Sequence, residues 1–156
     1  MAITPIEDRK VIAQNRKARH EYFIEDTYEA GIMLQGSEVK SLRQGKVNIA
    51  DAYGEPSSDG IYLLNAHIAE YTEANRFNHY PTRPRKLLMH RAELKKLLGK
   101  LKVQGYTFVP LSLYFNKKNI AKIEMALVKG KKLYDKRASE KEKDWKRDQQ
   151  RMMKDQ

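Results

Sequence analysis

The chain has 156 residues, contains no cysteine and carries a formal net charge of +11. The length indicates one domain with extensions, and the missing thiols exclude disulfides, thiolate metal sites and cysteine nucleophiles. No run approaches the roughly 18 apolar residues of a membrane span, and acidic residues interrupt the region where a signal peptide would stand, so we expect a cytoplasmic protein without a membrane partner.

The charge is distributed unevenly along the chain. Residues 1–78 hold 9 basic and 12 acidic residues, whereas residues 79–156 hold 22 and 8. A field polarised in this way favours an anionic partner, and nucleic acid is the first candidate. A membrane surface is a weaker candidate because no segment combines a strongly apolar face with a basic one.

Short predicted elements separated by polar turns make up the first half of the chain. A capping box between Thr4 and Glu7 predicts a helix start, although few apolar residues follow it. Ser37 is expected to cap a second helix that stops at Gly45. Strands are expected over residues 22–24, 31–35, 47–53 and 61–71, with turn residues over 54–60.

The second half is expected to hold an extended connection, a helix and a hairpin. Residues 79–89 contain two prolines and are typical of extended chain. Leucines recur at i, i+3, i+4 and i+7 over 94–101, which predicts an amphipathic helix that Gly105 ends. Alternating residues over 106–115 and 121–128 predict the hairpin. Its first strand would place on one face Val109, Leu111, Leu113 and Phe115.

Several short strands, with a helix before the last hairpin, predict a mainly β fold. The expected class is a small closed antiparallel barrel with short helices, and the OB-fold is the usual barrel of this size that binds nucleic acid. Periodicity alone also allows other small α+β folds. The expected organisation is an N-terminal extension over 1–14, a barrel domain over 15–129 and a basic tail over 130–156.

Two basic segments are candidates for contact with RNA phosphates. The first, over 15–20, holds Asn15, Arg19 and His20, and the alternative is a solvated head segment. The second, over 81–88, restricts its backbone with prolines, and the alternative is a charged loop. Its cations are Arg83, Arg85 and Lys86.

Apolar side chains in these regions have two interpretations. Leu87 and Leu88 follow the second basic segment as core residues, or one of them forms a stacking surface at the barrel rim. Aromatic residues on the predicted strands can stack on bases, but core packing is their commoner role. These aromatic residues are Tyr22, Phe23, Tyr114 and Phe115.

Catalytic chemistry has little support in the sequence. The four histidines lack metal-ligand spacing, and no glycine-rich phosphate-binding motif is present. A nuclease would need Glu29, Glu38 and Asp51 to gather around Mg²⁺, and solvated surface charge is the favoured interpretation. We therefore expect no enzyme, no cofactor and no metal site.

Residues 130–137, GKKLYDKR, join the barrel to a tail with too little apolar material for a core. Their cations can neutralise phosphates, and the ring of Tyr134 can stack on a base. Trp145 and Met152 are seven positions apart and would share one side of a helix. We expect a tail that is disordered when free and helical on a partner, the alternative being a permanently disordered solubilising tail.

Four stretches make the chain resemble the SsrA-binding protein (SmpB) family. They are NRKARHEYFIEDTYEAGIMLQGSEVKSLRQGK, LLNAHI, PTRPRKLL and GKKLYDKR, and the similarity runs from Asn15 to Met153. The resemblance implies an OB-fold adaptor that binds the tRNA-like domain of transfer-messenger RNA (tmRNA). Together the two rescue ribosomes stalled on truncated messages by trans-translation.

The resemblance also assigns roles to particular positions. The RNA-binding positions of the family fall on Asn15, Arg19, His20, Glu29, Leu88 and Lys122, with Arg83, Arg85 and Lys86 beside them. Its tail positions, at the decoding centre and in the empty message channel, fall on Lys131, Lys132, Tyr134, Asp135, Lys136, Arg137, Trp145, Met152 and Met153. Some relatives carry histidine in place of Tyr134, and a phenol does not become cationic near neutral pH.

The implied partners are tmRNA, the stalled ribosome and, through the aminoacylated RNA, elongation factor Tu. The protein is expected to act as a monomer. The alternative is a general OB-fold RNA-binding or ribosome-associated factor.

Overall fold

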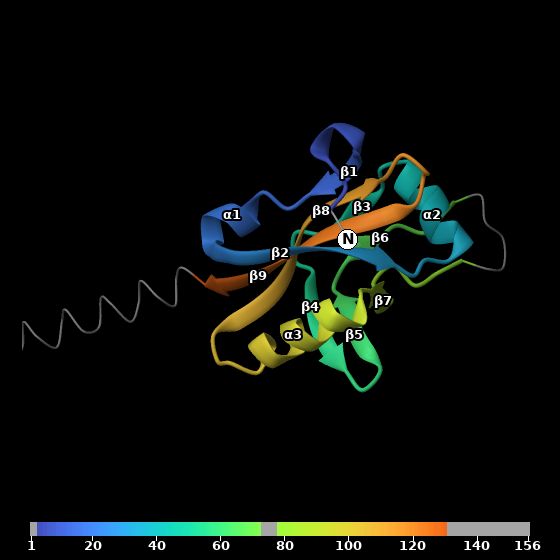
Figure 1. The fold of residues 1–156 in the computed structure, drawn as a ribbon. Coiled ribbons are helices and arrows are strands. Elements are labelled where there is room, and N and C mark those ends of the chain that lie inside the picture. The colour runs from blue at the N-terminus through green and yellow to red at the C-terminus, as the bar shows by residue number, and fades with distance from the viewer. Residues whose placement is uncertain (1–2, 73–77, 131–156) are drawn as a thin grey trace, which may run out of the picture.

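The computed structural model describes residues 3–72 and 78–130 of the chain. Figure 1 shows the strands wound into a small barrel, with α1, α2 and α3 at three separate sides of it. In chain order the elements are η1 (Ile6–Asp8), β1 (Lys10–Gln14), α1 (Lys17–Glu21), β2 (Tyr22–Ile32), α2 (Gly36–Arg43), β3 (Val47–Asn48), β4 (Tyr53–Ser57), β5 (Gly60–Leu64), β6 (His67–Ile68), β7 (Arg85–Leu88), α3 (Arg91–Leu101), β8 (Tyr106–Phe115) and β9 (Ala121–Gly130).

The strand pairings run in a closed ring. β8 pairs with β4, β4 with β5, β5 with β7, β7 with β2 and β2 with β9, which returns to β8. All of these pairs are antiparallel, β1 pairs with the later part of β8, and β3 and β6 form a separate two-stranded sheet. This OB-like, mainly β barrel with short helices confirms the predicted fold class.

The barrel closes where β4 crosses β8 at Gly54 and Phe108. A Cβ atom on Gly54 would lie 2.5 Å from Cδ2 of Phe108, so only glycine lets the two strands approach this closely. Phe108 is fully buried, and its ring meets that of Tyr28 edge to face at 6.0 Å. The closure therefore depends on one missing side chain and one large buried ring.

A register shift in β8 changes which face its side chains occupy. The shift lies between Pro110 and Ser112, where proline cannot donate to the strand ladder. Val109 and Leu111 consequently pack in a small outer cluster, whereas Leu113 and Phe115 pack in the main core. The prediction that these four residues share one face is wrong, because simple alternation does not continue through a bulge.

The later elements agree with the sequence pattern. The hairpin of β8 and β9 is confirmed, and α3 buries Leu97 against the main core. Gly45 and Gly105 both adopt positive φ, at 72° and 95°, after the helices they were predicted to end. The capping box of α2, however, uses Gln35 and Glu38 in place of the predicted Ser37 cap.

The early elements differ from the sequence pattern. The predicted N-terminal helix is only the 3₁₀ turn η1, and the chain then adds β1 to the barrel. Apolar residues in this region are few, so tertiary pairing with β8 decides the structure in place of local helical preference. The predicted strands over 47–53 and 61–71 are interrupted, and the extended connection over 79–89 contains β7.

Candidate nucleic-acid interface

A cavity of about 530 Å³ opens on the barrel where β7 and β9 flank β2. Four residues assigned to RNA binding line it, namely Glu29, Lys86, Leu88 and Lys122. The N-terminal Ile3 and the beginning of α3 also contribute to its wall. The structure therefore brings together side chains from three strands that are far apart in the sequence.

Gly31 shapes this cavity. It lies opposite Leu88 of β7 and Lys122 of β9, and a Cβ atom on it would lie 3.3 Å from Cβ of Leu88. Glu29 precedes Gly31 by two positions and therefore lies on the same face of β2. Gly31 is not among the residues predicted from the sequence, although a glycine inside a strand signals a close approach.

Leu88 gives the cavity an apolar rim. Its residue surface is 51% exposed, whereas the preceding Leu87 is buried in the main core. The difference follows from the alternation of side chains along β7. The sequence left open which of the two leucines is a core residue. In the structure Leu87 is the core residue, and Leu88 presents an exposed apolar surface.

The Glu29 carboxylate is an oriented acceptor. Its Oε2 atom accepts a hydrogen bond from the backbone N–H of Thr4 at 2.9 Å and another from the hydroxyl of Tyr114. Burial raises the pKa of Glu29, but these hydrogen bonds and the charge of Lys122 outweigh that effect, so the pKa lies below its usual value. Glu29 is therefore ionised at neutral pH.

The two lysines of the cavity differ in their partners. The Nζ atom of Lys86 lies 3.7 Å from Oδ2 of Asp59, which also accepts a hydrogen bond from Tyr62 at 2.7 Å. Within residues 3–72 and 78–130, the side chain of Lys122 forms neither a hydrogen bond nor an ion pair. Its ammonium group is thus available to an anionic partner.

Arg85 is a structural residue and does not belong to an exposed basic strip. It is fully buried, and its Nε atom donates to Oε2 of Glu38 at 2.5 Å. Its other nitrogens donate to the carbonyls of Ala66 at 2.8 Å and Pro81 at 3.0 Å. A guanidinium enclosed in this way has no face for RNA, so the interpretation of Arg85 as an RNA contact is corrected.

Arg83 completes the same cluster from a more open position. Its Nη2 atom lies 2.5 Å from Oε1 of Glu38, and its side chain is 29% exposed. Burial raises the pKa of Glu38, but the hydrogen bonds from Arg83, Gln35 and Arg85 outweigh it and hold the pKa below its usual value. Arg83 and Arg85 therefore serve first to neutralise a buried carboxylate.

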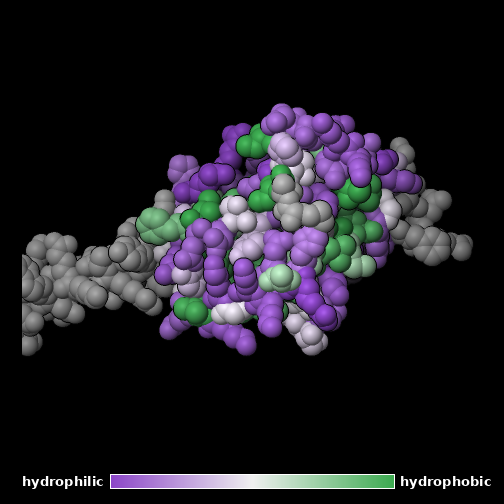
Figure 2. Space-filling view, in the orientation of Figure 1, coloured by the Kyte–Doolittle hydropathy of each residue, from purple (hydrophilic) through white to green (hydrophobic). Residues whose placement is uncertain are grey.

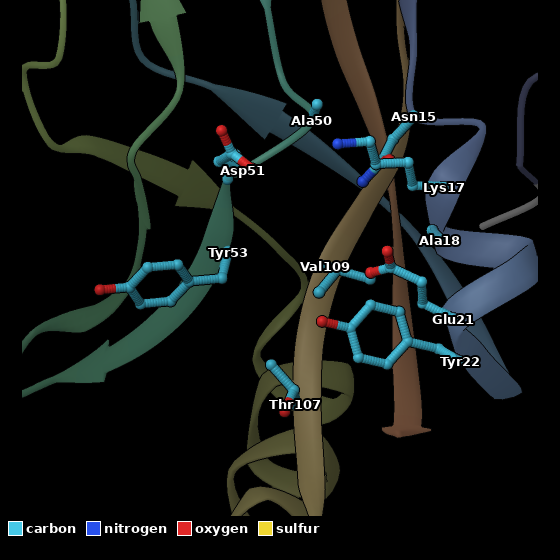
Figure 3. Close-up of a pocket in the computed structure, with 11 residues that line it drawn as sticks. Asn15, Lys17, Ala18, Glu21, Tyr22, Ala50, Asp51, Tyr53, Thr107 and Val109 are labelled. Carbon is cyan, nitrogen blue, oxygen red and sulfur yellow. The ribbon is translucent and has the colours of Figure 1, made fainter. Parts of the chain in front are cut away.

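Asn15 lies at a second cavity, of about 300 Å³, between α1, β4 and β8. Its Nδ2 atom donates to the carbonyl of Pro110 at 3.1 Å, whereas its buried Oδ1 atom has no partner in the described part of the chain. Figure 3 shows the polar ends of Asn15, Lys17 and Glu21 directed toward one space, with Tyr53 turned away from them.

Arg19 and His20 lie on α1, and both are exposed. Arg16 and Lys17 are exposed beside them, so the basic run forms the outer surface of this short helix. The predicted RNA-binding residues thus fall into two regions, the Glu29 cavity and the α1 side. The predicted tail positions lie outside the described residues, namely Lys131, Lys132, Tyr134, Asp135, Lys136, Arg137, Trp145, Met152 and Met153.

The surface agrees with a polar partner. On the face seen in Figure 2, hydrophilic residues dominate and apolar residues form small separate groups. Among residues 3–72 and 78–130, no three histidine, aspartate or glutamate side chains gather as a metal site. Glu38 is instead paired with Arg83 and Arg85. None of the described helices is long and apolar enough to cross a membrane.

Comparison with known proteins gives consistent relationships. The family described as "SmpB protein" matches residues 12–155. The SsrA-binding protein of Rickettsia prowazekii (strain Madrid E) is 58% identical over 148 residues, covering 95% of this chain and 97% of the relative. That of Rickettsia canadensis (strain McKiel) is 61% identical over 145 residues, covering 93% and 95%.

A solved structure is also similar. It is described as "tmRNA-SmpB: a journey to the center of the bacterial ribosome", and one of its chains is 48% identical with a TM-score of 0.64. The match covers 76% of this chain and 83% of that one.

Replacing Glu38 with glutamine is expected to lower the free energy of unfolding by about 3 kcal/mol, because Arg85 would stay buried without its counter-charge. Urea unfolding measures the change in the free energy of unfolding. The matched control is Glu55→Gln, because Glu55 is an exposed residue of β4. Since the pKa of folded Glu38 is below 4.5, its contribution is present above that pH and is lost as the pH falls further. Equal stability and equal acid sensitivity in both variants would contradict this account.

Proposed function

The chain belongs to the SmpB protein family, and we propose that it binds tmRNA and delivers it to stalled ribosomes for trans-translation. In this role it is an RNA-binding adaptor in the cytoplasm without catalytic activity of its own. Its partners are tmRNA and the ribosome, with elongation factor Tu joining through the aminoacylated RNA. The protein acts as a monomer.

The gathering of Glu29, Leu88 and Lys122 around one cavity carries this proposal. The Glu29 carboxylate accepts hydrogen bonds from base amino or imino groups, and the exposed face of Leu88 contacts a base. Lys122 neutralises a phosphate, and Lys86 adds a second positive charge. An acceptor, an apolar platform and cations within one cavity suit an unstacked nucleotide of a folded RNA loop.

The α1 side extends the contact along the RNA. Arg19 and His20, with the neighbouring Arg16 and Lys17, offer phosphate contacts that set the orientation of the barrel. Asn15 adjoins this helix, and its unpartnered Oδ1 atom is buried, so it would accept from RNA only if the side chains that cover it move. Because these groups are on a helix and a buried loop of the barrel, little conformational freedom is lost when RNA binds.

The tail is assigned to the ribosome. Its cations from Lys131 to Arg137 would neutralise ribosomal RNA phosphate at the decoding centre, where Tyr134 stacks on a base. The segment that includes Trp145, Met152 and Met153 would then form a helix in the message channel. A channel that already holds message excludes the tail, so the tail senses the absence of a strand.

Replacing Lys122 with alanine is expected to weaken binding of a tRNA-like-domain transcript about three- to tenfold and to reduce the salt slope of the binding constant by about 1. Fluorescence anisotropy over a salt series measures both quantities. Lys118→Ala is the matched control, since Lys118 is an exposed lysine in the turn of the same hairpin. Identical losses in the two variants would mean that only total charge matters.

Ending the chain after Gly130 is expected to change affinity for the same transcript by less than about threefold and to abolish peptide tagging on stalled ribosomes. Strand β9 ends at Gly130, so the barrel keeps all of its pairing. Anisotropy and a reconstituted tagging reaction measure the two activities, with Lys118→Ala in the full-length chain as the control. If transcript binding and peptide tagging fall together, the assignment of the first to the barrel and of the second to the tail is wrong.

A further inference from the structure

The N-terminal segment, residues 3–9, reaches the Glu29 cavity from outside the barrel ring. Ile3 lines the cavity, and the backbone N–H of Thr4 donates to Oε2 of Glu29 at 2.9 Å. The Nε atom of Arg9 donates to the carbonyl of Thr4 at 2.8 Å, which fixes the segment in this position. The segment is therefore a part of the cavity wall and not a separate extension.

Tyr114 on β8 holds the same carboxylate oxygen from the outer face of the barrel, because its neighbours Leu113 and Phe115 face the main core. Its residue surface is fully buried on β8, and its hydroxyl donates to Oε2 of Glu29. Burial and the hydrogen bond to Glu29 both raise the pKa of Tyr114, so the hydroxyl stays protonated and remains a donor. Two donors, one from the N-terminal segment and one from β8, thus meet at one atom on the outer face of the barrel.

Arg9 links these two supports. Its Nη1 atom lies 2.6 Å from Oε2 of Glu124, and its guanidinium carbon lies 4.4 Å from the centre of the Tyr114 ring. Glu124 stands directly opposite Glu29 in the pairing of β2 and β9. Two carboxylates in that relation repel each other, and the charge of Arg9 offsets the repulsion.

We propose that Thr4, Arg9 and Tyr114 are positioning residues that fix the Glu29 carboxylate for RNA recognition, an inference that rests on the proposed function. The backbone N–H of Thr4 and the hydroxyl of Tyr114 both donate to Oε2, and the side chain of Thr4 adds a hydrogen bond to the same carboxylate. The carboxylate is thereby fixed at the wall of the cavity, where its remaining acceptor capacity is open to a nucleotide. A fixed acceptor loses less conformational freedom on binding and rejects a base that presents no donor.

Replacing Tyr114 with phenylalanine is expected to weaken binding of the tRNA-like-domain transcript about three- to tenfold, because the donor to Glu29 is lost. The salt slope of the binding constant stays unchanged, since no phosphate contact is removed. Tyr106→Phe is the matched control, because Tyr106 lies on the same strand and donates to Glu25 at 3.2 Å away from the cavity. Fluorescence anisotropy gives the affinity, and thermal unfolding gives the stability of each variant.

A double-mutant cycle separates positioning from a general effect on the fold. Adding Tyr114→Phe to Glu29→Ala is expected to cause no further loss of affinity, because the group that Tyr114 positions is already absent. Thr4→Pro, which removes the other donor near the chain terminus, is expected to behave in the same way. A further loss in the Glu29→Ala background would overturn the positioning role.

The remaining outcomes distinguish the two proposals. If Glu29→Ala weakens binding while Tyr114→Phe and Thr4→Pro do not, the positioning role is wrong and the RNA site stands. If Glu29→Ala itself leaves the affinity unchanged, the assignment of this cavity to RNA is wrong, and the positioning role fails with it.

Discussion

The buried ion pair between Glu38 and Arg85 is the constraint on which the cavity between β2, β7 and β9 depends. It fixes the beginning of β7, a strand of four residues that pairs with β2 through Gly31 and Ile32. A slip of one residue would turn Leu88 into the core and expose its neighbour, because successive side chains alternate between faces. A buried guanidinium that satisfies one carboxylate and several carbonyls permits only one register.

Two carboxylates of similar chemistry have different uses in this barrel. Glu38 is buried, and each of its carboxylate oxygens pairs with an arginine. Its charge therefore holds Arg83 and Arg85 in place within the fold. Glu29 is partly exposed at a cavity beside Lys122, and its hydrogen-bond donors are the uncharged groups of Thr4 and Tyr114. The charge of the partners and the burial of each carboxylate thus separate a structural role from the proposed recognition role, although both carry the same formal charge and a lowered pKa.

The local spacing of apolar residues was sufficient to predict the elements whose side chains follow a regular period. The leucine stripe predicted α3, and alternation predicted the hairpin of β8 and β9. The local pattern did not predict the role of a residue where a partner distant in the sequence determines it. In the sequence, Arg85 resembles a surface cation in a basic run. Only the fold shows that it forms a buried ion pair with Glu38. Likewise, nothing near Thr4 in the sequence indicates a contact with Glu29, 25 positions away.

The central claim is that RNA is held at the cavity between β2, β7 and β9. The most direct test is a titration of the full-length, isotope-labelled protein with the tRNA-like-domain transcript, followed through the backbone amide signals. The account predicts that the largest changes cluster at Gly31, Leu88 and Lys122, with a second group on α1. Changes confined to the outer face of α3 and the turn before β9, with the cavity signals unmoved, would contradict it.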